Sequence, residues 1–280
     1  MDKFCIIVNK DRDERLELTT RVQKFLTEHG KQYIVRMESL DSVGEDWESL
    51  PEDIECVIVL GGDGTLIRAA NRLLKYSIPM FGINAGTLGY MTGVEASEAE
   101  HGLERLCSDA FRVEERMLLD SCINGQYVDT VLNEVAITRS GFSRLINLEV
   151  YVNGALLDIV SGDGLLIATP TGSTGYNLSA GGAVVKPQTQ LILITPICPH
   201  SLSSRGIIVS AEDEIAVEIQ QSKRGPEVEA YATFDGRVAR KLKAEDRIVI
   251  KRSNYTTKMV QLDERTFFEV LRSKLGSVEK

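Results

Sequence analysis

The sequence predicts an α/β domain followed by a β-rich domain, with a last helix that returns to the first domain. In the first third, short apolar runs alternate with helix-like segments, which indicates a parallel sheet covered on both faces. After residue 112 the pattern changes to short strand-like runs joined by turn residues, which is typical of a sandwich of antiparallel sheets. We therefore expect an α/β domain over residues 1–112, completed by 262–280, and a β-rich domain over 113–261.

The expected elements of the first domain follow from the spacing of its apolar residues. Leucine, valine and phenylalanine recur at helical spacing over Glu14–Glu28, and a further helix is expected over Leu66–Leu74. The strands of the parallel sheet are expected at Phe4–Val8, Tyr33–Val35, Cys56–Leu60 and Pro79–Ile83.

The β-rich domain contains two Asn-Gly pairs, Asn124-Gly125 and Asn153-Gly154, each between apolar runs. Such pairs are strong signals for tight hairpins. Its strands are expected at Leu118–Ile123, Tyr127–Thr138, Leu148–Val152, Leu156–Ile159, Leu165–Ala168, Leu191–Thr195, Ile215–Ile219, Val228–Phe234 and Arg247–Ile250. The apolar residues of Glu264–Leu275 recur at helical spacing, and we expect this last helix to bury them against the first domain.

Composition excludes several classes of protein. The formal net charge of −9 argues against a surface that binds a nucleic-acid backbone. Five scattered cysteines without a CxxC pair and three isolated histidines argue against a disulfide framework and a zinc site. No apolar run approaches the roughly 18 residues of a membrane span. We expect a cytoplasmic protein with neither nucleic acid nor membrane as partner.

The most informative motif is Gly61-Gly62-Asp63-Gly64-Thr65, between an apolar run and a helix-like segment. Glycines at a strand-to-helix turn let backbone N–H groups approach a phosphate. An aspartate beside phosphates is repulsive unless it takes a proton or holds a metal ion, so the motif indicates phosphoryl transfer. The sequence leaves both roles open for Asp63, and the structural alternative is a helix N-cap.

Three further segments are candidates for binding. Gly82–Tyr90 is a second glycine-rich loop after a strand, and Asn133-Glu134 places two polar residues inside an apolar run. Residues 161–182 are dense in glycine and hydroxyl groups. Because Walker A, GxGxxG and GxSxG motifs are missing, P-loop kinases, ordinary dehydrogenases and serine hydrolases are disfavoured.

Taken together, these motifs resemble those of the NAD kinases, which phosphorylate the adenosine ribose 2′-hydroxyl of NAD with ATP to give NADP. The similarity extends over GGDGT at 61–65, GINAGTLGY at 82–90, the pair at 133–134, GDG at 162–164, TPTGSTGYNLSAGG at 169–182 and TPICPHSLSSR at 195–205. The resemblance implies a nucleotide-binding first domain, an NAD-binding second domain, ATP as phosphoryl donor, Mg²⁺ or another divalent cation, and a homodimer or homotetramer.

The resemblance also implies site residues. Asp63 matches the proposed catalytic base, and Asn133 and Glu134 match a pair that binds the adenosine part of NAD. Ser161 and Asp163 match positions near the nicotinamide. The full expected NAD-binding set is Asp63, Gly64, Arg68, Asn133, Glu134, Arg144, Ser161, Asp163, Thr174, Gly175, Tyr176, Asn177, Leu178, Ser179 and Arg237.

Two alternatives remain at this point. Diacylglycerol-type lipid kinases share GGDGT, but they need a membrane-facing surface that the acidic composition does not favour. A non-catalytic NAD or NADP sensor would keep the pocket without turnover, although the intact Asp63 gives no reason for lost chemistry.

Overall fold

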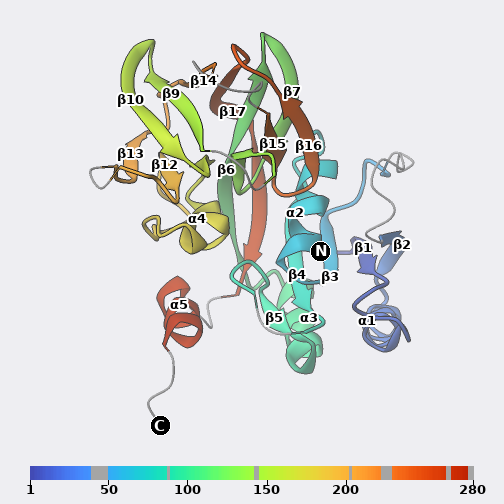
Figure 1. Ribbon diagram of the computed structural model, residues 1–280. Helices are drawn as coiled ribbons and strands as arrows, with labels where there is room; N and C mark the ends of the chain where they lie inside the picture. Colours follow the sequence, from blue (N-terminus) through green and yellow to red (C-terminus); the bar gives the residue numbers. More distant parts are fainter. Residues whose placement is uncertain are drawn as a thin grey trace. The chain divides into compact units, whose positions relative to one another are not determined.

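The structure is a computed structural model of the chain, and it describes residues 1–38, 50–86, 89–141, 145–201, 204–221, 229–262 and 266–276 (Figure 1). The chain divides into two compact units. Unit one comprises Met1–Glu115 and Thr257–Lys280, and unit two comprises Arg116–Thr256.

Unit one is built on a parallel sheet. Its strands lie in the order β2 (Gln32–Glu38), β1 (Lys3–Asn9), β3 (Cys56–Gly61) and β4 (Met80–Asn84). Beyond β4 lie β5 (Val94–Glu95) and the end of β17 (Arg247–Gln261), where Met259 is paired with Met80. β1, β3 and β4 are almost continuously apolar, which fits strands that are buried on both faces.

Helices cover both faces of this sheet. The side chains of Phe4, Ile58 and Phe81 share one core with α1 (Glu17–Glu28) and α3 (Ala99–Cys107). On the opposite face, a side chain added at Gly82 would meet Leu66 of α2 (Asp63–Arg72). The predicted doubly covered α/β sheet is therefore confirmed. A short 3-10 turn at Ala96–Glu98 precedes α3.

Unit two contains two layers of mostly antiparallel strands. One sheet has the order β13 (Ile207–Ser210), β12 (Leu191–Ile197), β11 (Gly164–Ala168), β8 (Glu134–Arg139), β15 (Ala230–Phe234) and β16 (Val238–Leu242). The other contains β10 (Ala155–Gly162), β9 (Ile146–Val152), β14 (Ile215–Ile219), β17, β6 (Arg112–Ile123) and β7 (Gln126–Val131). Residues of both sheets share one apolar core, which confirms the predicted sandwich-like arrangement.

Both predicted hairpins form. Asn124-Gly125 connects β6 to β7, and Asn153-Gly154 connects β9 to β10, with positive φ at all four residues. This is the backbone conformation of a type I′ turn, whose twist matches that of the flanking strands.

One predicted strand is wrong. The expected strand Tyr127–Thr138 is two strands, because β7 ends at Val131 and β8 begins at Glu134. β7 pairs with β6, whereas β8 pairs with β11 and β15, so the chain changes sheets at Leu132-Asn133. The apolar pattern carries no mark of such a change, since Val131 and Leu132 before the break and Val135–Ile137 after it are all buried.

The last helix, α5 (Phe267–Leu275), belongs to unit one. Thr266 and Glu269 form a capping box that fixes its start. The described residues cover its apolar face only in part: Phe267, Val270 and Leu271 are half-buried, and Phe268 is 61% exposed. The earlier end of the expected helix, at Glu264, lies outside the described residues. Within the described part of the chain, no helix is long and apolar enough to span a bilayer.

Candidate active site

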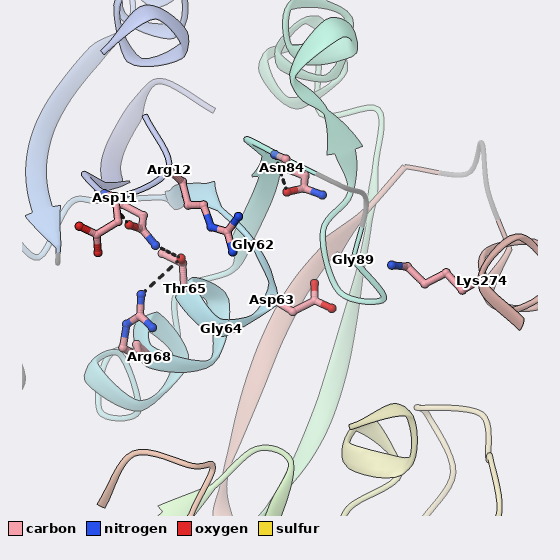
Figure 2. Close-up of a pocket in the computed structure, with 12 residues that line it drawn as sticks. Asp11, Arg12, Gly62, Asp63, Gly64, Thr65, Arg68, Asn84, Gly89 and Lys274 are labelled. Carbon is pink, nitrogen blue, oxygen red and sulfur yellow. Dashed lines mark hydrogen bonds between the residues drawn. The ribbon is translucent and has the colours of Figure 1, made fainter. Parts of the chain in front are cut away.

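The GGDGT segment lies at the rim of a cavity of about 400 Å³ in unit one (Figure 2). Gly61 is the last residue of β3 and Asp63 is the first residue of α2. The segment therefore joins the end of the strand to the helix N-terminus, whose backbone N–H groups are free of helix partners. The cavity is lined by Asn9, Asp11, Arg12, Gly62, Asp63, Gly64, Thr65, Arg68, Asn84, Gly86, Gly89 and Lys274. Its volume lies within the range of small-molecule sites, and a helix N-terminus on its wall favours an anion.

Asp63 is not a helix cap. The residue that caps α2 is Gly62, and no side chain forms a capping hydrogen bond there. Instead, the backbone N–H groups of Tyr90 and Met91 donate to the Asp63 carboxylate oxygens at 2.7 and 3.1 Å. A side chain at Gly89 would overlap the carboxylate, so glycine is required for this approach. Two glycine-rich loops are thereby joined through Asp63.

Arg68 is held beside the same cavity by a buried acid. Its Nε lies 3.3 Å from Glu38 Oε1, and Arg72 Nε lies 3.5 Å from the same atom. Arg68 Nη2 also donates to Thr65 Oγ1, which accepts a second hydrogen bond from Asn9. Burial raises the pKa of Glu38, and the two arginines oppose that rise. Glu38 is therefore a positioning residue for Arg68.

One side-chain donor at this cavity lacks a hydrogen-bond partner in the part of the chain that the structure describes. Asn84 Oδ1 accepts the N–H of Gly86 at 3.0 Å, but Nδ2 of Asn84 is buried without a hydrogen-bond acceptor among the described residues. Because an unpaired buried donor is costly, this atom is suited to an acceptor on a bound ligand.

In unit two, the change of sheets at Leu132-Asn133 is held by Asp235. Its carboxylate accepts the backbone N–H groups of Leu132, Asn133 and Glu134 at 2.9, 2.8 and 3.1 Å. Burial raises the pKa of Asp235, and these amides together with Arg237 oppose that rise. Three backbone donors at the change of sheets are thus satisfied by one side chain.

Three polar atoms next to this crossover have no hydrogen-bond partner among the described residues. They are Oδ1 of Asn133, Oε2 of Glu134 and Oγ1 of Thr171, all of them buried. Gly175 lies against the side chains of Glu134 and Asn133, since a Cβ there would be 3.0 Å from Glu134 Oε2 and 3.3 Å from Asn133 Nδ2. Native proteins rarely leave such groups unpaired, so the cluster indicates a site for a ligand with matching donors.

The segment after β11 folds closely over this cluster. It consists of a 3-10 turn, Thr171–Thr174, and the short helix α4 (Tyr176–Ser179). A side chain at Gly172 would overlap the backbone of Asn133, so the turn packs directly on the crossover. The amide of Asn177 is used internally, because Nδ2 donates to Ser173 and Ala183 and Oδ1 accepts from Thr195. Tyr176 is 42% exposed and leaves its ring accessible.

Asp163 and Ser161 lie at the junction of β10 and β11. Arg139 Nε donates to Asp163 Oδ1 at 2.6 Å, and the Arg139 N–H donates to the Asp163 carbonyl oxygen at 3.0 Å. The Ser161 carbonyl oxygen accepts the N–H of His200. Arg139 therefore fixes the orientation of the Asp163 carboxylate.

The expected site residues fall into two groups. Unit one holds Asp63, Gly64 and Arg68, and unit two holds the others that the structure describes. Arg237 Nη2 lies 3.2 Å from Asp129 Oδ2 and 3.9 Å from Asp235 Oδ2. Its Nε is buried without an acceptor among the described residues. Arg144 lies outside the described residues, as do Thr87 and Leu88 of the second glycine-rich loop.

Sequence reasoning missed Glu38, Asp235 and Lys274. Glu38 and Lys274 stand in ordinary strand and helix patterns, which carry no sign of a site. Asp235-Gly236 does carry a signal, because it is a hairpin turn between β15 and β16, but that signal concerns the turn rather than the site.

Glu134 makes a pH-dependent contribution to stability. Burial and the nearby Asp235 raise its pKa from 4.5 to about 7. Because the folded chain binds this proton more tightly, the stabilisation is complete below about pH 4.5 and is lost as pH rises through 7. Relative to Glu134→Gln, the free energy of unfolding of the wild type should fall between pH 4.5 and 8, by on the order of 3 kcal/mol. Urea unfolding of both proteins across this pH range measures the difference. If the free energies of unfolding of wild type and Glu134→Gln changed equally with pH, the burial of this carboxyl would be contradicted.

Comparison with known proteins gives consistent matches. The family model described as ATP-NAD kinase N-terminal domain matches residues 4–111, and ATP-NAD kinase C-terminal domain matches residues 132–262. An NAD kinase of Lachnoclostridium phytofermentans is 44% identical over 283 residues, covering 99% of each chain. An NAD kinase of Lachnospira eligens is 39% identical over 293 residues, covering 98% of this chain and 100% of that protein.

Two solved structures are also similar. An NAD kinase from Archaeoglobus fulgidus in complex with ATP has a TM-score of 0.77 at 25% identity, covering 98% of this chain and 99% of that chain. Yeast NADH kinase complexed with NADH has a TM-score of 0.84 at 23% identity, covering 100% of this chain and 89% of that chain. The second similarity concerns the fold.

Proposed function

The chain belongs to the ATP-NAD kinase family, and from that premise we propose how its residues carry out the reaction. The resemblance inferred from the motifs is confirmed, and the protein is a kinase that phosphorylates NAD with ATP. We assign phosphoryl transfer to Asp63 in unit one, and recognition of NAD mainly to the cluster around Asn133 and Glu134 in unit two.

Asp63 is the proposed catalytic base. The 2′-oxygen of the adenosine ribose forms a bond to the γ-phosphorus of ATP, and the bond from that phosphorus to the β,γ-bridging oxygen breaks, releasing ADP. The hydroxyl proton passes to a carboxylate oxygen of Asp63. Each oxygen of this carboxylate accepts one backbone N–H and keeps a second lone pair for the substrate.

The cavity beside Asp63 is the proposed place of the ATP phosphates. Its support is the start of α2 on its wall, the unpaired Nδ2 of Asn84 and the cationic lining. A phosphate chain would supply acceptors to these donors, and little covalent chemistry is required of the protein beyond positioning and charge.

The observation that carries the NAD assignment is the group of unpaired buried atoms on Asn133, Glu134 and Thr171. The Asn133 amide can pair with the edge of adenine, and the Glu134 carboxylate can accept from ribose hydroxyls. We further propose contacts from Gly64, Arg68, Arg144, Ser161, Asp163, Arg237 and the stretch Thr174, Gly175, Tyr176, Asn177, Leu178 and Ser179. In that stretch Tyr176 can stack, whereas Asn177 acts by holding the loop.

Magnesium is proposed as the companion of ATP. Among the described residues, no group of three or more His, Cys, Asp or Glu side chains could hold a metal ion. The lining of the cavity does include two acids, Asp11 and Asp63. Mg²⁺ is commonly bound by one or two carboxylates together with substrate phosphates, so these residues fit an ion that arrives with ATP. When bound, it would neutralise charge on the phosphates.

We also propose a cytoplasmic homodimer or homotetramer. Its support is exposed apolar surface: Leu156, Leu157 and Ile159 on the edge strand β10 of unit two, and Phe268 and Leu275 on α5. Exposed apolar patches mark association surfaces. Light scattering of the purified protein tests this point.

A coupled assay tests the function. The protein is incubated with ATP, Mg²⁺ and NAD, and an NADP-specific dehydrogenase reports the product. We expect steady formation of NADP that depends on all three additions. Folded protein that bound NAD without forming NADP would indicate a sensor, and phosphorylation of diacylglycerol vesicles in place of NAD would indicate a lipid kinase.

A further inference from the structure

We propose that Lys274, on the C-terminal helix α5, binds the polyphosphate of the donor next to Asp63, so that α5 forms part of the catalytic cavity. The proposal rests on the assignment of ATP to that cavity and adds a residue of the last helix to it. The ligand class is a chain of phosphates, as in ATP or tripolyphosphate.

The position of Lys274 is the first argument. It lines the same cavity as Gly62, Asp63 and Gly64, although α5 is about 200 residues away along the chain. Figure 2 shows its side chain pointing from α5 toward the loop that carries Gly89, in the direction of Asp63. Its Nζ lies 5.3 Å from the ring centroid of Tyr90, whose N–H donates to Asp63.

The charge balance of the cavity is the second argument. The lining contains three cations, Arg12, Arg68 and Lys274, and two acids, Asp11 and Asp63. Arg68 is already paired with the buried Glu38, whereas Lys274 forms no ion pair with any described residue. A triphosphate brings several negative charges and needs unpaired cations close to the transferring group. Lys274 is suited to that role because its ammonium is a mobile point charge on a long stem.

The alternative role for Lys274 is purely structural, namely stabilisation of its own helix. A cation in the last turn interacts favourably with the helix dipole, and α5 carries two such cations, Arg272 and Lys274. Arg272 does not line the cavity. The two residues therefore share the helix-end effect and differ in access to the phosphates, which makes Arg272→Met a matched control.

The test compares Lys274→Met, Lys274→Arg and Arg272→Met in the full-length protein. Calorimetry measures binding of ATP and, separately, of tripolyphosphate, and steady-state kinetics measures KM for ATP and for NAD. For Lys274→Met we expect about a tenfold loss of affinity for both phosphate compounds, a matching rise in KM for ATP and an unchanged KM for NAD. Lys274→Arg should recover most of the affinity, and Arg272→Met should bind as the wild type does.

Several results would overturn the proposal. These are equal binding by Lys274→Met and Arg272→Met, or a loss of ATP affinity without a loss for tripolyphosphate, which would place Lys274 near the nucleoside instead. A wild type that binds both compounds but makes no NADP contradicts the proposed function, while the binding comparison still decides the role of Lys274. A wild type that binds neither compound contradicts both.

Discussion

Replacing Asp63 by asparagine is expected to lower kcat for NADP formation by about 10²–10⁴-fold, the usual contribution of a general base. The variant keeps the shape of the side chain but loses the group that takes the 2′-hydroxyl proton. KM for NAD should change little, because the unpaired atoms that support NAD recognition lie on Asn133, Glu134 and Thr171. Steady-state kinetics with the coupled assay gives both values.

The Asp63→Asn variant is also expected to be less stable than the wild type. In Asp63→Asn the new amide cannot offer two acceptor oxygens to the N–H groups of Tyr90 and Met91, so one of these donors is left facing an NH₂ group. We expect a loss of about 1–3 kcal/mol in the free energy of unfolding. The exposed Glu52 has no ion pair with any described residue, so Glu52→Gln, the same carboxylate-to-amide change, serves as control and should affect neither kcat nor stability. Near-normal turnover of Asp63→Asn would remove Asp63 as the base.

Replacing Asp235 by alanine is expected to destabilise the protein by about 3 kcal/mol or more and to raise KM for NAD at least about tenfold. The change leaves the backbone N–H groups of Leu132, Asn133 and Glu134 without an acceptor at the point where the chain changes sheets. Because Asn133 and Glu134 carry the proposed NAD contacts, loss of their anchor weakens binding as well as folding. Urea unfolding and steady-state kinetics measure the two effects.

Two companion variants separate the role of Asp235 from a general loss of charge. Asp235→Asn can keep an oxygen in the position of Oδ1, which accepts from Asn133 and Glu134, and should retain most of the NAD affinity. Glu214→Ala removes an exposed carboxylate of unit two that forms no side-chain contact with the described residues, and it should be neutral. If Asp235→Ala were as stable as the wild type and bound NAD normally, the crossover would not depend on this carboxylate.

Much of the fold could be predicted because its signals are local. The strand-turn-helix at Gly61–Thr65 and the two Asn-Gly hairpins appear where the sequence indicates them. The break between β7 and β8 could not be predicted, since Val131–Ile137 is apolar on both sides of the break. What enforces it is Asp235, about 100 residues further along the chain, and a periodic pattern contains no such long-range contact.

The candidate site was predictable to a similar extent. Motifs drew attention to Asp63, Asn133 and Glu134, because polar residues among glycines or inside an apolar run are unusual. Other residues act by positioning a site residue, as Glu38 positions Arg68 and Arg139 positions Asp163. They stand in ordinary sequence patterns and acquire this role only through tertiary contacts. The same holds for Lys274, which the fold of unit one brings to the cavity.

The claim that Asp63 acts in transfer of the γ-phosphoryl group from ATP to NAD is tested most directly by a single-turnover experiment. Enzyme in excess over γ-radiolabelled ATP is mixed with Mg²⁺ and saturating NAD, quenched at successive times, and the label in NADP is counted. The wild type should convert the bound ATP rapidly, and Asp63→Asn should transfer the label at least about 100-fold more slowly while binding both substrates. Equal transfer rates in the two proteins would contradict the account.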